Sequence, residues 1–231
     1  MRAFNCFATN YWRKAHGMDE VNFLERCLSD CRGVRGILHV GAHRGQEAEL
    51  YCRRGIDRVL WIEANPDLEE PLTARVKPLG HRVVMAAVGS HCHTGSFYVT
   101  SNDGESSSLL PLGTHATLWP NITVAKTIDT PVRTLDSIHD EHGLTDNNFW
   151  VLDVQGGEAD VLRGSERSLA IADYVLCEFG ESLYQGGTTV EELDQLLSDF
   201  SAVQAWDSPW GIGEILFCRV RRTATQLLRI G

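Results

Sequence analysis

Short apolar segments alternate with segments of helical spacing along most of this chain of 231 residues. ILHV at 37–40 and VLWIE at 59–63 have the length and composition of buried strands, and QEAELYCRRG at 46–55 has the spacing of a helix. Such alternation predicts a mostly parallel sheet with helices on both faces. Too few residues join the last two predicted strands, 202–207 and 214–220, for a crossover helix, so we expect an antiparallel pair at one edge.

Local signals place several elements more closely. Asn65 followed by Pro66 is a typical helix start, and Thr189 and Glu192 have the spacing of a capping box. The run RVVMAAVG at 82–89 predicts one buried strand.

The chain shows no convincing domain linker, so we expect a single domain over residues 1–231. A helical leader is expected within 1–33, because Leu24, Cys27 and Leu28 share one helical face. The polar segment 101–127 has no clear periodicity, and such long segments in compact domains often form lids or binding loops. We therefore predict that 101–127 binds the acceptor substrate.

Composition excludes several classes of protein. The net charge of −10 would repel nucleic acid, and no basic stripe offsets it. No apolar run approaches the length of a membrane span, and the N-terminus lacks the features of a secretory signal. Seven cysteines without a CxxC pair are typical of reduced thiols, so we expect a cytoplasmic protein without membrane partners.

Two glycines, Gly41 and Gly45, follow the first predicted strand directly. In such sheets ligands bind beyond the carboxyl ends of the strands, where glycine lets a ligand approach the backbone closely. The turn is not the dinucleotide motif GxGxxG, because His43 stands where that motif needs glycine. It suits a smaller ligand with an amino-acid tail, and we expect His43 to line the turn without binding a metal.

The next two strand ends extend this predicted site. Glu63 ends the second strand about twenty residues beyond the turn, where an acid can accept hydrogen bonds from both ribose hydroxyls. Ala87 and Val88 end the third strand, where we expect an adenine to stack.

The order of several motifs gives the chain a more specific resemblance. ILHVGAHRGQE, VLWIEANP, SSSLL, VRTLDSI, LDVQGGEADVLRG and LCEFGESLYQG follow one another between Ile37 and Arg219. In this order they resemble the FkbM family of S-adenosylmethionine-dependent methyltransferases. The resemblance implies a class I methyltransferase fold, a Rossmann-like seven-stranded sheet whose last strand is antiparallel, and methyl transfer to hydroxyls of sugars, polyketides or similar metabolites.

The resemblance also implies which residues bind the cofactor. One position departs from many relatives, which carry an acidic residue where this chain has His39. The expected S-adenosylmethionine-binding residues are His39, Gly41, Ala42, His43, Gly45, Glu47, Glu63, Ala64, Asn65, Ala87, Val88 and Asp153.

Methyl transfer to an alcohol needs a base, or a metal that acidifies the hydroxyl. Asp153 and Glu178 end the fourth and fifth parallel strands, so both carboxylates should face the transferred methyl group. Catechol O-methyltransferase-like enzymes hold magnesium with acids at these strand ends, so the pair is a candidate Mg²⁺ site. A metal-free role for Asp153 is an equal alternative, and His115 in the 101–127 segment is a further candidate base.

The acceptor is expected to contact Ser106, Ser107, Ser108 and Glu158. Two other functions compete with methyl transfer: a nucleotide- or nicotinamide-binding oxidoreductase, and a non-catalytic module that binds S-adenosylmethionine. The missing GxGxxG motif argues against the oxidoreductase, whereas His39 favours the module. The sequence leaves the acceptor, the metal requirement and the oligomeric state open.

Overall fold

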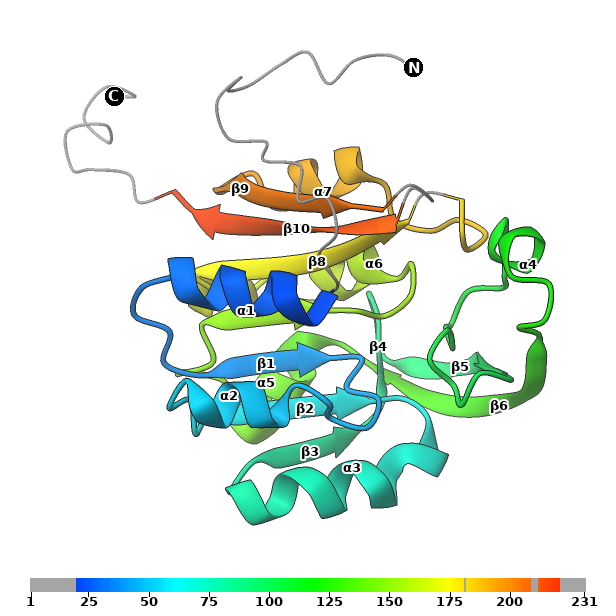
Figure 1. Ribbon diagram of the computed structural model, residues 1–231, viewed down its shortest axis with the longest axis horizontal. Coiled ribbons are helices and arrows are strands. Elements are labelled where there is room, and N and C mark those ends of the chain that lie inside the picture. Colours follow the sequence, from blue (N-terminus) through cyan, green and yellow to red (C-terminus); the bar gives the residue numbers. More distant parts are fainter. Residues whose placement is uncertain (1–19, 181, 209–211, 221–231) are drawn as a thin grey trace.

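A seven-stranded sheet forms the centre of the computed structural model, which describes residues 20–180, 182–208 and 212–220 (Figure 1). The strand order is β3-β2-β1-β7-β8-β10-β9, and β10 is antiparallel to both of its neighbours. The strands are β1 Ile37–Val40, β2 Val59–Glu63, β3 Arg82–Met85, β7 Phe149–Leu152, β8 Tyr174–Gly180, β9 Phe200–Asp207 and β10 Ile212–Arg219. The predicted parallel sheet with an antiparallel edge pair is confirmed.

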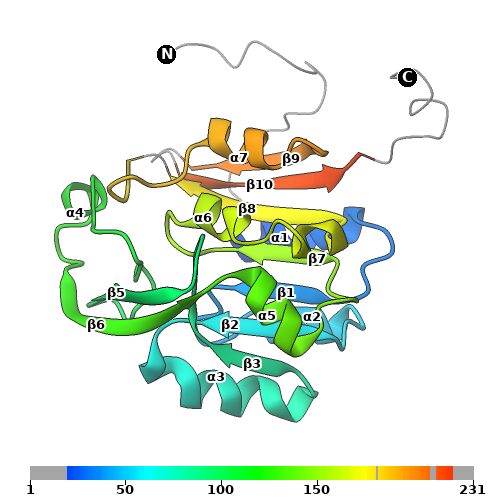
Figure 2. The same ribbon diagram turned by 180° about the vertical axis from the view of Figure 1, so that it is seen from behind.

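Helices cover both faces of this sheet (Figures 1 and 2). One face carries α1 Glu20–Asp30, α2 Ala48–Arg53 and α3 Glu69–Val76, and the other carries α5 Leu135–His142, α6 Glu158–Arg163 and α7 Val190–Leu196. Short 3₁₀ helices lie at η1 Pro66–Leu68, η2 Lys77–Leu79 and η3 Ser168–Ile171. Within the predicted leader, α1 buries Leu24, Cys27 and Leu28, and residues 1–19 lie outside the described part of the chain.

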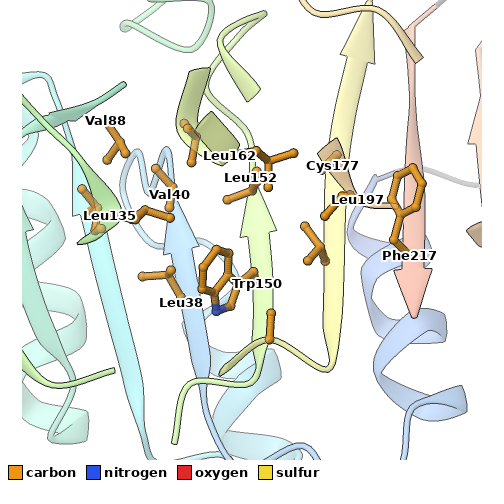
Figure 3. Packing of buried hydrophobic residues seen from close by; sticks show 14 of the residues in the cluster. Leu38, Val40, Val88, Leu135, Trp150, Leu152, Leu162, Cys177, Leu197 and Phe217 are labelled. Carbon is orange, nitrogen blue, oxygen red and sulfur yellow. The ribbon is translucent and has the colours of Figure 1, made fainter. Parts of the chain in front are cut away.

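Each face of the sheet has its own apolar core. Figure 3 shows the core beneath α5–α7, where Leu38 and Val40 of β1 lie beside Trp150 and Leu152 of β7. Strands β1, β2 and β7 are buried on both faces, which explains why they appear in the sequence as continuous apolar runs.

The predicted helix starts are confirmed. The Asn65 side chain accepts a hydrogen bond from the backbone of Asp67 at the start of η1. Thr189 and Glu192 form a complete capping box at the start of α7.

A second sheet corrects two sequence predictions. The strand expected over 82–89 divides at Ala86, because β3 stays in the main sheet whereas β4 Ala87–Val88 joins a three-stranded sheet in the order β4-β6-β5. Its other strands are β5 His93–Thr100 and β6 Val124–Arg133, and the sequence predictions missed β6. Figure 1 shows this small sheet beyond the carboxyl ends of β1 and β2.

The segment 101–127 is more ordered than its composition predicts. Ser108 pairs with Tyr98 of β5, α4 His115–Leu118 forms a single turn, and β6 begins at Val124. In the part of the chain that the structure describes, no helix combines the length and apolar character needed to cross a membrane.

Candidate active site

In the turn after β1, the backbone at Gly41 lies very close to the backbone at Asp153. Gly41 has φ +87°, and a Cβ atom there would lie 1.6 Å from the carbonyl oxygen of Asp153. The backbone N–H groups of Gly41 and Ala42 both donate to the carbonyl of Ile62. The turn after β1 therefore packs against the ends of β2 and β7, which leaves no room for a side chain at position 41.

Glu63 faces this turn at the end of β2 and is only 7% exposed. Its Oε2 accepts from the backbone N–H of His43 at 2.8 Å, and its Oε1 accepts from that of Asn65 at 2.7 Å. Burial raises the pKa of Glu63, and these backbone donors partly offset the rise. Each oxygen keeps a further lone pair that a hydroxyl group can use.

Two cavities meet at the carboxyl ends of the parallel strands. The first, here the turn cavity, lies above β1, β2 and β4 and includes Glu63, Ala87 and Val88. The second, here the loop cavity, has a volume of about 370 Å³, within the usual range for small-molecule sites, and includes His115 and Trp119. Five residues line both cavities: Gly41, His43, Asp153, Gln155 and, from the 101–127 segment, Glu105.

The structure brings most of the predicted site residues to these cavities. The turn cavity is lined by Gly41, His43, Glu63, Ala64, Ala87, Val88, Ser107 and Asp153. The loop cavity adds His39, Ala42, Glu47, Ser106, His115 and Glu178.

Four predicted site residues line neither cavity, and the structure shows them in contacts within the protein. Gly45 packs against α3, and Asn65 caps η1. The Ser108 hydroxyl is buried and donates to the backbone carbonyl of Gln155. Glu158 lies beneath the loop that follows β7, where its Oε1 accepts from the backbone N–H groups of Val154 and Gly156.

His39 is buried and electrically neutral. Its Nδ1 lies 2.9 Å from the Tyr51 hydroxyl, and its ring stacks on Trp61 with centroids 4.8 Å apart. Burial lowers the pKa of His39 to about 3. The imidazole therefore supplies no charge to the loop cavity.

His43 connects the turn to the 101–127 segment. Its Nε2 lies 3.1 Å from the Asp103 carbonyl, and its Nδ1 lies 2.8 Å from the amide nitrogen of Gln46. Nε2 therefore carries the proton and donates, while Nδ1 accepts. Both ring nitrogens are used, which agrees with the expectation that His43 lines the turn.

The loop cavity has a polar wall formed by His115 and its neighbours. His115 is 4% exposed, its Nε2 lies 3.1 Å from the Ser106 hydroxyl, and its ring lies between those of Trp119 and Tyr184. Burial lowers the pKa of His115, so the imidazole is neutral at pH 7. The cavity thus offers a neutral imidazole, a hydroxyl and an indole ring on one side.

Asp153 and Glu178 also line the loop cavity. They are joined by Gln155, whose Nε2 donates to Asp153 Oδ1 and to Glu178 Oε2, both at 2.7 Å. Among the described residues, no three His, Cys, Asp or Glu side chains converge as metal ligands. This donor set does not fit the predicted Mg²⁺ site.

Sequence reasoning missed Gln155 and Tyr184. Gln155 lines both cavities and has φ +57°, which is uncommon for a residue other than glycine. The available signal was its place before two glycines at the end of a buried strand, where tight loops concentrate functional side chains.

Glu158 is expected to make folding stability depend on pH. The side chain is 0% exposed and its Oε2 has no hydrogen-bond partner among the described residues, so burial raises its pKa from 4.5 to about 7. From about pH 4.5 to 7 the folded state holds a proton that the unfolded state has lost, so the free energy of unfolding falls as pH rises through this window. Glu158→Gln should remove this fall in the free energy of unfolding. Its gain in stability over wild type should be largest above pH 7.

Urea unfolding at several pH values measures this effect. Exposed Glu166, changed to Gln, is the matched control and should leave the pH dependence unchanged. Parallel stability curves for wild type and Glu158→Gln would contradict the assignment.

Comparisons with known proteins agree with this geometry. Residues 39–203 match the model of the methyltransferase FkbM domain family. The 2-O-methyltransferase NoeI of Sinorhizobium fredii (strain NBRC 101917 / NGR234) is 24% identical over 190 residues, which cover 78% of this chain and 77% of NoeI.

Two solved structures match the chain. A Streptococcus agalactiae protein of the NADB-Rossmann superfamily has a TM-score of 0.51 and 13% identity, covering 91% of this chain and 73% of that protein. A TehB-like SAM-dependent methyltransferase of Corynebacterium glutamicum has a TM-score of 0.45 and 16% identity. The match covers 85% of this chain and 87% of that protein. With its seven-stranded sheet of class I methyltransferase type and a family match over most of its length, the chain belongs to the FkbM family of S-adenosylmethionine-dependent methyltransferases.

Proposed function

We propose that this protein transfers a methyl group from S-adenosylmethionine to a hydroxyl group of a sugar or a related small metabolite. The observation that carries the proposal is the junction of the two cavities. Gly41, Asp153 and Gln155 line both of them, so a cofactor in the turn cavity presents its methyl group to the loop cavity.

The turn cavity, with a volume of about 80 Å³, has a lining suited to the adenosine part of the cofactor. The Glu63 carboxylate is held by two backbone donors and is placed to accept from the ribose hydroxyls. Apolar side chains of Ala87 and Val88 provide a surface for adenine. When bound, the cofactor supplies a methyl group on a sulfonium, which is a good leaving group, so positioning contributes much of the catalysis.

The loop cavity fits a hydroxylated acceptor. The amide of Asn102 and the hydroxyl of Ser106 can hydrogen-bond to sugar hydroxyls, and the indole of Trp119 offers a flat apolar surface. The relation to a 2-O-methyltransferase supports oxygen as the methylated atom.

Asp153 is the group that we assign to the acceptor proton. Its Oδ1 accepts from Gln155, and its carboxylate lies at the junction of the cavities, where the attacking oxygen must lose its proton. Neutral His115 also lines the loop cavity and is assigned to acceptor binding through Ser106.

A small acceptor is favoured over nucleic acid. Among the described residues that line the two cavities there is no Lys or Arg, whereas Glu47, Glu105, Asp153 and Glu178 all are acidic. Phosphate groups would be repelled from this entrance.

Labelled S-adenosylmethionine with a panel of oligosaccharides and small alcohols tests the function. We expect methyl transfer to a hydroxyl group, located by mass spectrometry of the product. Cofactor binding without turnover on any acceptor would support a non-catalytic module, and transfer to RNA would contradict the assigned acceptor.

Glu63→Ala should weaken S-adenosylmethionine binding at least tenfold, or ~1.4 kcal/mol, because charge-assisted hydrogen bonds to the ribose are lost. Titration calorimetry measures the dissociation constant. Exposed Glu69 on α3, changed to Ala, removes the same charge away from the cavities and should leave affinity unchanged. An unchanged affinity in Glu63→Ala would overturn the ribose assignment.

A further inference from the structure

Gln155 joins four parts of the active site. Its side-chain nitrogen donates to Asp153 after β7 and to Glu178 on β8, both at 2.7 Å. Its side-chain oxygen lies 2.6 Å from the Tyr184 hydroxyl, in the loop after β8. Its backbone carbonyl accepts from the Ser108 hydroxyl at 2.8 Å.

These partners allow only one orientation of the Gln155 amide. The –NH₂ group has two hydrogens, one for each carboxylate. The Tyr184 hydroxyl, whose single proton also faces the Ser106 carbonyl at 3.0 Å, donates to the amide oxygen at the shorter distance of 2.6 Å. A flipped amide would place its oxygen against two carboxylates, where no proton is available. The hydrogen-bond partners therefore fix which end of the Gln155 amide faces the two carboxylates.

The backbone around Gln155 holds this arrangement in place. Gln155 has φ +57° and is followed by Gly156 with φ +98°. A Cβ atom at Gly156 would lie 3.0 Å from the Tyr184 ring, so the loop packs tightly on that ring. Strained backbone of this kind persists where the surroundings hold it, commonly at functional sites.

Two strand-end carboxylates side by side repel each other, and proteins often offset such repulsion with a bound cation. Here a neutral side chain lies between them and gives each carboxylate a hydrogen bond. We propose that the Gln155 amide takes the place of a divalent cation between Asp153 and Glu178, so that this active site works without metal. Gln155 is then a positioning residue, which fixes the two carboxylates relative to the acceptor.

The inference rests on the site proposed above for methyl transfer, but its main test requires no turnover. Manganese binding to the cofactor-free protein is measured by the paramagnetic resonance signal of free Mn²⁺. Wild type should bind Mn²⁺ no better than a nonspecific protein. Gln155→Glu places a third carboxylate between the other two, and oxygen ligands of this kind suit Mn²⁺. It should bind Mn²⁺ at least tenfold more tightly than wild type.

Gln185→Glu is the matched control. Gln185 is exposed in the loop after β8, and its side chain donates to the Leu112 carbonyl, so the variant adds the same charge outside the site. It should bind Mn²⁺ as wild type does. Thermal unfolding of both variants establishes that they are folded.

Two results would overturn the proposal. One is tight Mn²⁺ binding by wild type, which remains informative even when Gln155→Glu does not fold. The other is a folded Gln155→Glu that binds Mn²⁺ no better than Gln185→Glu. Methyl transfer by wild type should also be unchanged by EDTA, and a loss of turnover with EDTA would count against the proposal while leaving the methyltransferase assignment intact.

Discussion

Gly41→Ala is expected to destabilise the protein strongly and to abolish S-adenosylmethionine binding. The new Cβ atom would lie 1.6 Å from the Asp153 carbonyl oxygen, far inside any real contact. The Cβ atom is attached directly to the backbone that follows β1, and the oxygen belongs to the backbone that follows β7. Removing the collision therefore requires these two segments to move apart. Left-handed strain of ~1–2 kcal/mol and overpacking of ~1–3 kcal/mol together give roughly 3 kcal/mol or more.

Thermal unfolding and calorimetric titration with S-adenosylmethionine measure the two effects. For a domain of this size, the expected loss lowers the unfolding temperature by roughly 6–12 °C. Gly80→Ala separates strain from collision, because Gly80 has φ +79° and a Cβ atom there meets nothing within 4 Å. That control should lose only about 1 kcal/mol and keep its cofactor affinity. Equal losses of stability and cofactor affinity in Gly41→Ala and Gly80→Ala would show that the close approach of Gly41 to Asp153 does not cause the effect.

The centre of the main sheet was predictable because strands β1, β2 and β7 are buried on both faces. Parallel strands covered by helices appear as short apolar runs, and β1, β2, β7 and β8 all follow this pattern. Their order along the chain also allowed the antiparallel edge pair to be inferred from one short connection. The caps at Asn65 and Thr189 were equally local and equally predictable.

The small sheet was not predictable, because β6 lacks these signals. Most of its residues are exposed or half-buried, so the strand shows little apolar periodicity. It also contains Pro131, which cannot donate to a neighbouring strand and therefore argues against a strand in a sequence. The surroundings decide its structure, since β5 and β4 pair with it from both sides.

The site residues also divide into those with a local sequence signal and those whose contacts join distant parts of the chain. The acids at the ends of β2, β7 and β8 were predictable, because the carboxyl ends of parallel strands meet at one edge of the sheet. Gln155 and Tyr184 were missed because their contacts join loops that lie 29 residues apart in the chain. Glu158 was predicted to contact the acceptor, and strand-end proximity does not reveal that its carboxylate turns inward beneath the loop.

Asp153→Asn is expected to slow methyl transfer ~10²–10⁴-fold, the usual effect of removing a general base. The substitution keeps the shape of the side chain, and the Asn oxygen can still accept from Gln155. What it removes is the ability to take the acceptor proton. Single-turnover rates at saturating S-adenosylmethionine measure this loss without a contribution from product release.

Binding of S-adenosylhomocysteine distinguishes a chemical role from a structural one. This product has no sulfonium charge, so its affinity reports the shape of the site and should change less than threefold in Asp153→Asn. Asp160→Asn on α6 removes an exposed carboxylate that pairs with Arg163 and should leave the rate unchanged. If Asp153→Asn keeps more than a tenth of the wild-type rate, the proton must go elsewhere. Neutral His115, which lines the same cavity, would then become the base, because burial already keeps its imidazole unprotonated at pH 7.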